Sequence, residues 1–272
     1  MKSYLSIIAI LMVLSGCSEK SSQSSIGLEP GDTMVDSIGM EFVWVPAGKF
    51  NMGSDTGAEI EKPVHEVVIT KGFWIGKYEV TQEQYQKIMG KDPARSRLDH
   101  PADNVRRDDV LEFCKKLSDK EDVAYTLPTE AQWEYACRAG SDAKYCFGDS
   151  EDELGDYAWY DDNVVPTDLP PDSEGHARFI ILTCPVGQKK PNKWGIHDMH
   201  GNVAEWTLDT FARDYENSSN IDPVGPKYYS GYVVRGGNIY LGPEISTATI
   251  RRMDLNSYYG TDLGFRVVRL ID

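Results

Sequence analysis

The sequence predicts a single, loop-rich domain of the mixed α+β class. Three observations predict it: helical segments that begin with capping signals, short strand-like runs between them, and a long stretch without regular patterning. That stretch covers residues 141–192 and is rich in turns, aromatic residues and acids. Because 40% of the residues are hydrophobic, the chain is able to bury one large core. We therefore place one folded domain over residues 37–272.

Residues 1–16 predict a secretory signal peptide. A positive Lys2 precedes an apolar run over residues 4–14, which is too short to span a bilayer. The run ends in Leu14-Ser15-Gly16-Cys17, which resembles the lipobox of bacterial lipoproteins. That resemblance implies cleavage before Cys17, lipidation of Cys17 and, since Ser18 replaces an aspartate, an outer-membrane location. The alternative is an ordinary signal peptide with an incidental cysteine.

Residues 17–36 predict a flexible tether, since they are rich in Ser, Glu, Gly and Asp and poor in apolar side chains. The whole chain carries a net charge of -15. Such a charge argues against nucleic acid and anionic membrane surfaces as partners, although it says nothing about the fold.

Four cysteines remain after Cys17, and an exported protein permits disulfides among them. The sequence does not choose between the three possible pairings. Cys114 and Cys137 lie on apolar helix faces, where a buried thiol is the expected state. The other two are Cys146 and Cys184.

Strands are predicted where β-branched and aromatic residues alternate with polar ones between turn signals. Residues 40–46 form the clearest run, and Pro46 ends it. Residues 48–53 read as a tight turn into a second strand. Further strands are expected at residues 65–69, 73–80, 232–236 and 264–270.

Three helices are predicted from their first turns. Thr81 with Gln84 and Thr129 with Gln132 each form a capping box, which predicts helices that begin just after the threonines. A further helix has apolar residues at positions 110, 113, 114 and 117, and acidic residues at 108 and 109 suit its positive end.

The loop from Gly195 to Trp206 carries the densest candidate chemistry. The side chains of Asn202 and Glu205, with the Val203 carbonyl between them, supply the oxygen ligands that a calcium-like cation takes. The alternative is ordinary turn chemistry at Asn202 and a solvated charge at Glu205. A zinc site at His197 and His200 lacks the third and fourth ligands that zinc requires.

Six segments resemble the formylglycine-generating enzyme, or sulfatase-modifying factor, family. They are Gly39–Gly53 (GMEFVWVPAGKFNMG), Tyr78–Tyr85 (YEVTQEQY), Leu127–Gly140 (LPTEAQWEYACRAG), Gly195–Trp206 (GIHDMHGNVAEW), Arg235–Gly237 (RGG) and Gly264–Arg266 (GFR). The resemblance covers the whole mature domain and implies the family's form of the C-type lectin-like fold. It also implies calcium at Asn202, Val203 and Glu205. A second family calcium site uses an asparagine whose place is taken here by Trp159.

Enzymes of the family that this chain resembles use a copper mechanism, and this chain lacks the residues that bind the copper. Family enzymes hold copper(I) through two cysteines that follow the Arg-Gly-Gly motif, because copper(I) prefers soft thiolates. The matching positions here are Leu241 and Ser246, and no cysteine follows Cys184. We therefore expect no copper. An iron triad of His197, His200 and a carboxylate from Asp198 or Glu205 is a weaker alternative, since the extra helical domain of such family members is missing.

Two functions remain open. The first is a membrane-anchored, non-catalytic lipoprotein that binds a protein or glycan ligand or serves an envelope apparatus such as a secretion machine. Its expected ligand surface, which also resembles the variable region of retroelement-diversified lectin-like proteins, comprises Tyr240, Asn256, Tyr258, Tyr259 and Asp262. The alternative is a metal-dependent oxidoreductase of the formylglycine-generating type with an altered metal site.

Overall fold

The computed structural model describes residues 27–91, 97–169, 171, 173–174, 176–215, 219–227 and 231–271. The predicted signal peptide and Cys17 lie outside these residues. The last part of the predicted tether lies inside them and differs from the prediction. Thr33–Val35 forms strand β1, which pairs antiparallel with β2. The ordered chain therefore begins before Ser37, because Met34 packs against the core.

A five-stranded sheet in the order β1-β2-β5-β13-β6 lies at the centre of the molecule. Neighbouring strands in it are antiparallel. The other strands of this sheet are β2 (Glu41–Val45), β5 (Phe73–Gly76), β6 (Tyr125–Thr126) and β13 (Val268–Arg269).

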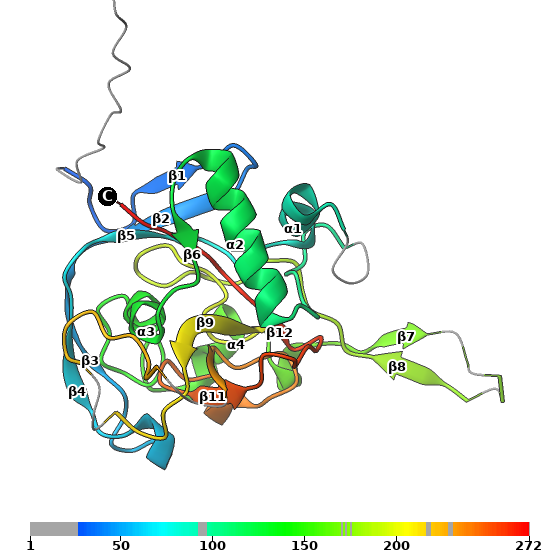
Figure 1. Cartoon of the computed structure of the whole chain (residues 1–272). Helices are drawn as coiled ribbons and strands as arrows, with labels where there is room; N and C mark the ends of the chain where they lie inside the picture. The colour runs from blue at the N-terminus through cyan, green and yellow to red at the C-terminus, as the bar shows by residue number, and fades with distance from the viewer. Residues whose placement is uncertain are drawn as a thin grey trace, which may run out of the picture.

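Both faces of this sheet are buried. Along β2, Phe42 and Trp44 pack into one hydrophobic cluster, whereas Val43 and Val45 pack into another. This alternation follows from the two-residue period of a strand. The first cluster includes residues of helices α1 (Gln82–Met89) and α2 (Arg107–Glu121), and the second includes residues of α3 (Glu130–Arg138). Figure 1 shows α1 and α2 on one side of the molecule and α3 on the other.

A second sheet of four strands, in the order β11-β10-β9-β12, carries the candidate site. β9 pairs antiparallel with β10 and parallel with β12, and β11 is the outer strand. The bounds are β9 (Ala204–Thr210), β10 (Tyr232–Arg235), β11 (Arg251–Asp254) and β12 (Leu263–Gly264).

The remaining elements are short. β3 (Gly48–Met52) pairs with β4 (His65–Ile69), and β7 (Thr167–Leu169) pairs with β8 (Arg178–Ile180) in an arm that extends from the body (Figure 1). The other helical pieces are α4 (Leu154–Tyr157) and the 3-10 turns η1 (Glu59–Glu61), η2 (Glu151–Glu153), η3 (Asp161–Asn163) and η4 (Pro243–Ile245). In the part of the chain that the structure describes, no helix is long and apolar enough to cross a membrane.

The mixed α+β prediction is confirmed, and so are the three helices. Both capping boxes form as expected, with the threonine side chain accepting from the third backbone N–H and the glutamine side chain reaching back. Two predicted strands are too long: residues 73–80 shorten to Phe73–Gly76, and residues 264–270 divide into β12 and β13. Strands β9, β11, β7 and β8 were not predicted; β9 begins inside the stretch from Gly195 to Trp206, which was interpreted as a loop.

Candidate functional site

The Arg-Gly-Gly motif ends β10 and turns the chain into the loop where family enzymes hold copper. Gly236 and Gly237 both have positive φ, at 100° and 68°. A side chain on Gly237 would place its Cβ 2.6 Å from the Ile245 carbonyl oxygen. The two glycines therefore bring residues 241–246 back against the start of the loop.

Neither position that corresponds to a copper ligand offers one. Leu241 is half-buried and contributes only backbone hydrogen bonds, to Asn238 and Asp161. Ser246 is fully buried, and its hydroxyl donates to the Gly242 carbonyl at 3.2 Å. A hydroxyl held in this way supplies neither the softness nor the negative charge that copper(I) requires.

A buried network of ion pairs between α3, β10 and β11 holds the start of the loop in place. Arg235 binds Glu134 of α3, and Glu134 also accepts from Arg138 at 2.9 Å. Arg251 of β11 binds Glu130 at 2.7 Å. Burial acts to lower the pKa of Arg235, but the neighbouring Glu134 carboxylate outweighs it and raises that pKa. The guanidinium therefore stays charged inside the protein.

This network was missed by sequence reasoning. The only local signal was the spacing of Glu134 and Arg138, which places both on one side of α3. Their side chains are at most 5% exposed. A pair at this spacing is normally solvated, so the pattern gave no reason to place it in the interior.

All four cysteines in the described residues are free thiols, which resolves the open question of their pairing in this structure. Burial raises the pKa of Cys114 and Cys146 to about 12 and that of Cys184 to about 11. Burial likewise raises the pKa of Cys137. Neutral thiols of this kind are poor metal ligands and poor nucleophiles.

The two candidate histidines serve separate structural roles. The Nδ1 atom of His200 lies 2.9 Å from the Ser246 carbonyl oxygen, and its Nε2 accepts from the Cys146 backbone N–H at 3.1 Å. Burial lowers the pKa of His200 to about 4, so the ring is neutral. His197 instead packs on Tyr78. Among the described residues no cluster of three or more His, Cys, Asp or Glu side chains is placed to hold a metal ion, so neither a zinc site nor an iron triad is assembled.

Two of the three predicted calcium ligands, the side chains of Asn202 and Glu205, are already hydrogen-bonded inside the protein. Asn202 Oδ1 accepts from the Cys184 backbone N–H at 2.9 Å, and the amide nitrogen donates to Glu79 at 3.0 Å. Both Glu205 oxygens accept from Arg266, and one also accepts from Trp133. Oxygens already saturated by buried donors do not also ligate a hard cation without losing those bonds. Sequence reasoning missed Glu79 and Arg266 as the partners of this motif.

A lysine ammonium group lies near Trp159, the residue at the position of the second family calcium site. Lys189 Nζ lies 3.9 Å from the centre of the Trp159 ring and donates to the Gly155 carbonyl. The Trp159 carbonyl in turn accepts from the Asn202 backbone N–H at 2.8 Å. Trp159 thus supports the Asn202 turn, where the family asparagine would supply an oxygen ligand.

The predicted ligand surface is only partly assembled. Tyr258 and Tyr259 are 41% and 51% exposed, and the Tyr258 hydroxyl donates to Asp262 at 3.1 Å. The Tyr240 hydroxyl is instead turned to the Ile181 carbonyl, and Asn256 donates to Asp108. Two tyrosine rings therefore form the accessible part of this surface, while Tyr240, Asn256 and Asp262 hold it in shape.

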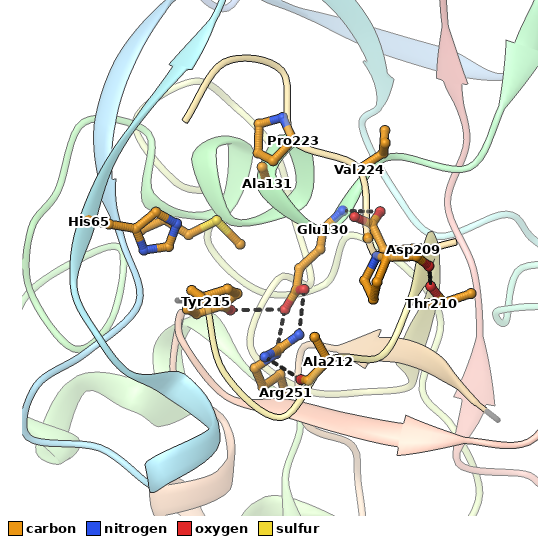
Figure 2. Close-up of a pocket in the computed structure, with 13 residues that line it drawn as sticks. His65, Glu130, Ala131, Asp209, Thr210, Ala212, Tyr215, Pro223, Val224 and Arg251 are labelled. Atoms are coloured by element: carbon orange, nitrogen blue, oxygen red, sulfur yellow. Dashed lines mark hydrogen bonds and ion pairs between the residues drawn. The ribbon is translucent and has the colours of Figure 1, made fainter. Parts of the chain in front are cut away.

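Among the cavities beside the network of ion pairs, two differ greatly in size. The smaller, of about 20 Å³, has room for one water and is drawn in Figure 2. Glu130 reaches between Arg251 and Tyr215 there, and its backbone N–H donates to Asp209 (Figure 2). The larger cavity, of about 690 Å³, lies beside the Arg-Gly-Gly loop and is lined by residues 53–58 and 142–144 with Glu244, Thr247 and Thr249. Of these two, the larger is of the size that accepts ligands.

A family model described as sulfatase-modifying factor enzyme 1-like domain matches residues 34–271. The chain belongs to this family. Chaperone protein LppX of Paenibacillus barcinonensis is 29% identical and aligns over 97% of this chain and 96% of its own length. The formylglycine-generating enzyme of Mus musculus is 27% identical over 66% of this chain, and the match spans 45% of that enzyme's length.

Solved structures agree with the family assignment. PvdO from Pseudomonas aeruginosa superposes with a TM-score of 0.75 and 28% identity, covering 89% of this chain and 99% of PvdO. Treponema denticola variable protein 1 superposes with a TM-score of 0.74 and 27% identity, covering 88% of this chain and 98% of that protein. The predicted formylglycine-generating-enzyme type of fold is thereby confirmed.

Proposed function

We propose that this member of the sulfatase-modifying factor family is a lipid-anchored protein of the bacterial outer membrane that binds a protein partner and does not generate formylglycine. The observation that carries the proposal is the loop after Arg235-Gly236-Gly237. Leu241 and Ser246 stand there in place of the thiol pair, and the hydroxyl of Ser246 is bonded within the loop. Copper(I) chemistry has no ligands at this point.

The thiols elsewhere do not substitute for the missing pair. Each has a pKa raised by burial, and none follows Cys184 in the sequence. A scaffold without its reactive groups should not be credited with the family reaction.

The match to the protein named LppX supports binding rather than catalysis, because that relative is described as a chaperone. Its alignment covers 97% of this chain and therefore extends into the first 26 residues, where the signal peptide and Cys17 are predicted. An alignment that reaches into this segment supports the proposed export and anchoring, since several acyl chains on one cysteine would hold a protein firmly in a bilayer. We expect no nucleic-acid ligand.

The exposed rings of Tyr258 and Tyr259 supply a recognition surface. Tyrosine offers a large, rigid contact area with a polar tip, which suits an adaptable protein or glycan ligand. Arg106 stacks on the Tyr259 ring at 4.9 Å and Asp262 holds Tyr258, so both rings are presented in fixed positions.

An oxygen-consumption assay with copper(I) and a cysteine-containing peptide tests the loss of catalysis. We expect the full chain to take up no oxygen above background, while a formylglycine-generating enzyme run in parallel does. Peptide-dependent uptake by the unmodified chain would establish the oxidoreductase alternative instead. The double variant Leu241→Cys with Ser246→Cys, analysed for bound copper, shows whether the loop itself still has the geometry to hold the metal.

Aggregation of reduced α-lactalbumin, followed by light scattering, tests the binding function. The unmodified protein should suppress scattering, and Tyr258→Ala with Tyr259→Ala should weaken that suppression. Lys115→Ala, on an exposed face of α2, is the control. Equal suppression by all three proteins would remove the two tyrosines from the proposed surface, and no suppression by any would argue against a chaperone-like role.

A further inference from the structure

Among the residues that the structure describes, no strand pairs with the outer edge of β11 in the four-stranded sheet. β11 pairs with β10 on one side and is the last strand of the sheet order on the other. An open edge presents unpaired backbone groups and is a template for another strand. Proteins commonly blunt such edges with charges of one sign, which repel a second copy.

The charges on β11 do not follow that rule. Arg252 and Asp254 lie two residues apart and therefore point to the same face of the strand. They bind each other within the chain at 2.7 Å, and Arg252 also binds Asp262 at 3.2 Å; the Arg252 side chain is 35% exposed and that of Asp254 is 14% exposed. Met253 lies between them and is 43% exposed.

The order Arg252-Met253-Asp254 places opposite charges against each other when two copies of the strand pair antiparallel. If two β11 strands pair antiparallel about a twofold axis at Met253, each Arg252 lies opposite Asp254 of the other copy. The two methionines then lie on the opposite face of the joined strands, where each side chain packs over Gly231 of its own copy. An isologous contact of this kind needs one surface that matches its own copy, and β11 provides it.

The backbone N–H and C=O groups of Met253 also point toward the open edge. The Asp254 carbonyl oxygen lies close to Gly231, just before β10, so it faces the interior of the sheet. Because N–H and C=O groups of successive residues alternate between the two sides of an antiparallel strand, those of Met253 face the open edge. Two copies of Met253 are therefore placed to exchange both hydrogen bonds.

We propose that the open edge of β11 binds the same edge of a second copy of this chain, joining two four-stranded sheets into one continuous sheet. The occupant is a second copy because the alternating Arg252 and Asp254 match their own reverse. The contact is short, so the dimer is weak in dilute solution; its formation at high local concentration on a membrane rests on the lipid anchor proposed above.

Charge reversal in the full chain tests this surface directly. Arg252→Asp places like charges opposite each other at both pairs of a homodimer, and so does Asp254→Arg. A mixture of the two variants restores two attractive pairs, because one copy is then acidic at both positions and the other basic. A variant with both substitutions restores the homodimer.

The readout is disulfide cross-linking through Met253→Cys in bacterial membranes that carry the full chain. Paired strand residues lie within the Cα separation that a disulfide requires. Val165→Cys, at a residue that is 86% exposed, is the matched control. We expect each single reversal to lower the cross-linked fraction by about tenfold, because two cross-strand pairs change sign.

The mixture distinguishes lost pairing from lost folding. Recovery of cross-linking in the mixture and in the doubly substituted variant supports the proposal, since complementary charges do not repair a misfolded chain. Cross-linking at Met253→Cys that is no greater than at Val165→Cys would overturn it. Single variants that cross-link as well as the unmodified edge, or a mixture no better than its components, would overturn it too.

Discussion

The space between the central sheet and helices α1 and α2 is filled by aromatic rings, whereas the space between α3, β9 and β10 is crossed by ion pairs. In the first region Tyr85 stacks on Phe113 with centroids 5.8 Å apart, and Phe265 meets Phe113 edge-on at 5.2 Å. In the second region Arg235 and Glu134 are both fully buried. The two regions therefore resist different changes, since the first depends on volume and the second on charge balance.

The difference also separates stability from specificity. Burial of apolar surface stabilises a fold without directional demands. A buried ion pair adds little net stability, because desolvation offsets the attraction, but the loss of one partner leaves an uncompensated charge. The charged region lies directly beneath the Arg-Gly-Gly loop, so it fixes the position of that loop more strictly than it strengthens the fold.

The largest expected effect comes from breaking the charge balance. We expect Arg235→Met or Glu134→Gln to lower the free energy of unfolding by about 3–5 kcal/mol, because each leaves a buried partner unpaired. Urea unfolding measures the change. The double variant Glu134→Leu with Arg235→Met should lose less than the sum of the two single changes. Lys115→Met, in an exposed pair with Asp119, is the control and should cost under about 1 kcal/mol.

Asp209 should make the charged region sensitive to pH. Burial, reinforced by the neighbouring Glu130, raises the pKa of Asp209 from its ordinary 3.8 to about 7. Between these two values the folded state holds a proton that the unfolded chain releases, so stability falls as the pH rises, and the loss is complete above the folded pKa. Asp209→Asn should reduce this slope in unfolding measurements at several pH values. An unchanged slope would place the titration elsewhere, for example at Asp198, whose pKa burial raises to about 6.

Conservative substitutions sharpen the contrast between the two regions. Phe113→Leu keeps an apolar side chain in the aromatic cluster and should cost no more than about 1–3 kcal/mol. Arg235→Lys keeps the charge but loses the planar fork that bonds Glu134 and the carbonyls of Ala248, Thr249 and Ile250. Thermal unfolding should therefore show the charge-conserving change to be the more harmful. The reverse order would mean that the charged region tolerates repacking.

The smallest expected effect concerns calcium. Because Arg266 and Trp133 saturate Glu205, we expect the unfolding midpoint to be the same with added calcium as with a chelator. A midpoint that rises with calcium concentration would show that Asn202 and Glu205 rearrange to take the ion, since a ligand that binds only the folded state stabilises it.

The aromatic region was predictable from the sequence because its elements carry local signals. The capping boxes at Thr81 and Thr129 and the alternation in residues 40–46 placed helices and strands close to their observed bounds. β9 carries the same alternation, from Ala204 to Leu208, but was missed because its first residues were interpreted as part of a loop. Its polar residues Glu205, Thr207 and Asp209 are buried, so they read as a loop or a solvated face.

The candidate site was predictable where chemistry depends on residue type. The absence of cysteine at positions 241 and 246 is visible in the sequence alone. The partners of Asn202 and Glu205 were not, because Glu79 and Arg266 lie 123 and 61 residues away along the chain. Only the fold brings such distant donors and acceptors together, and only then is it visible that the predicted calcium ligands are already engaged.

The way the Arg-Gly-Gly loop is held has a consequence for how this family diversifies. The loop is fixed by Arg235, by two glycines and by the contact between His200 and the Ser246 backbone, whereas the Ser246 hydroxyl bonds within the loop. An ancestor and a descendant can differ at these two side chains while sharing every anchor. The residues that position the loop and the two side chains that would hold copper are therefore different residues, so the second set can change without moving the first.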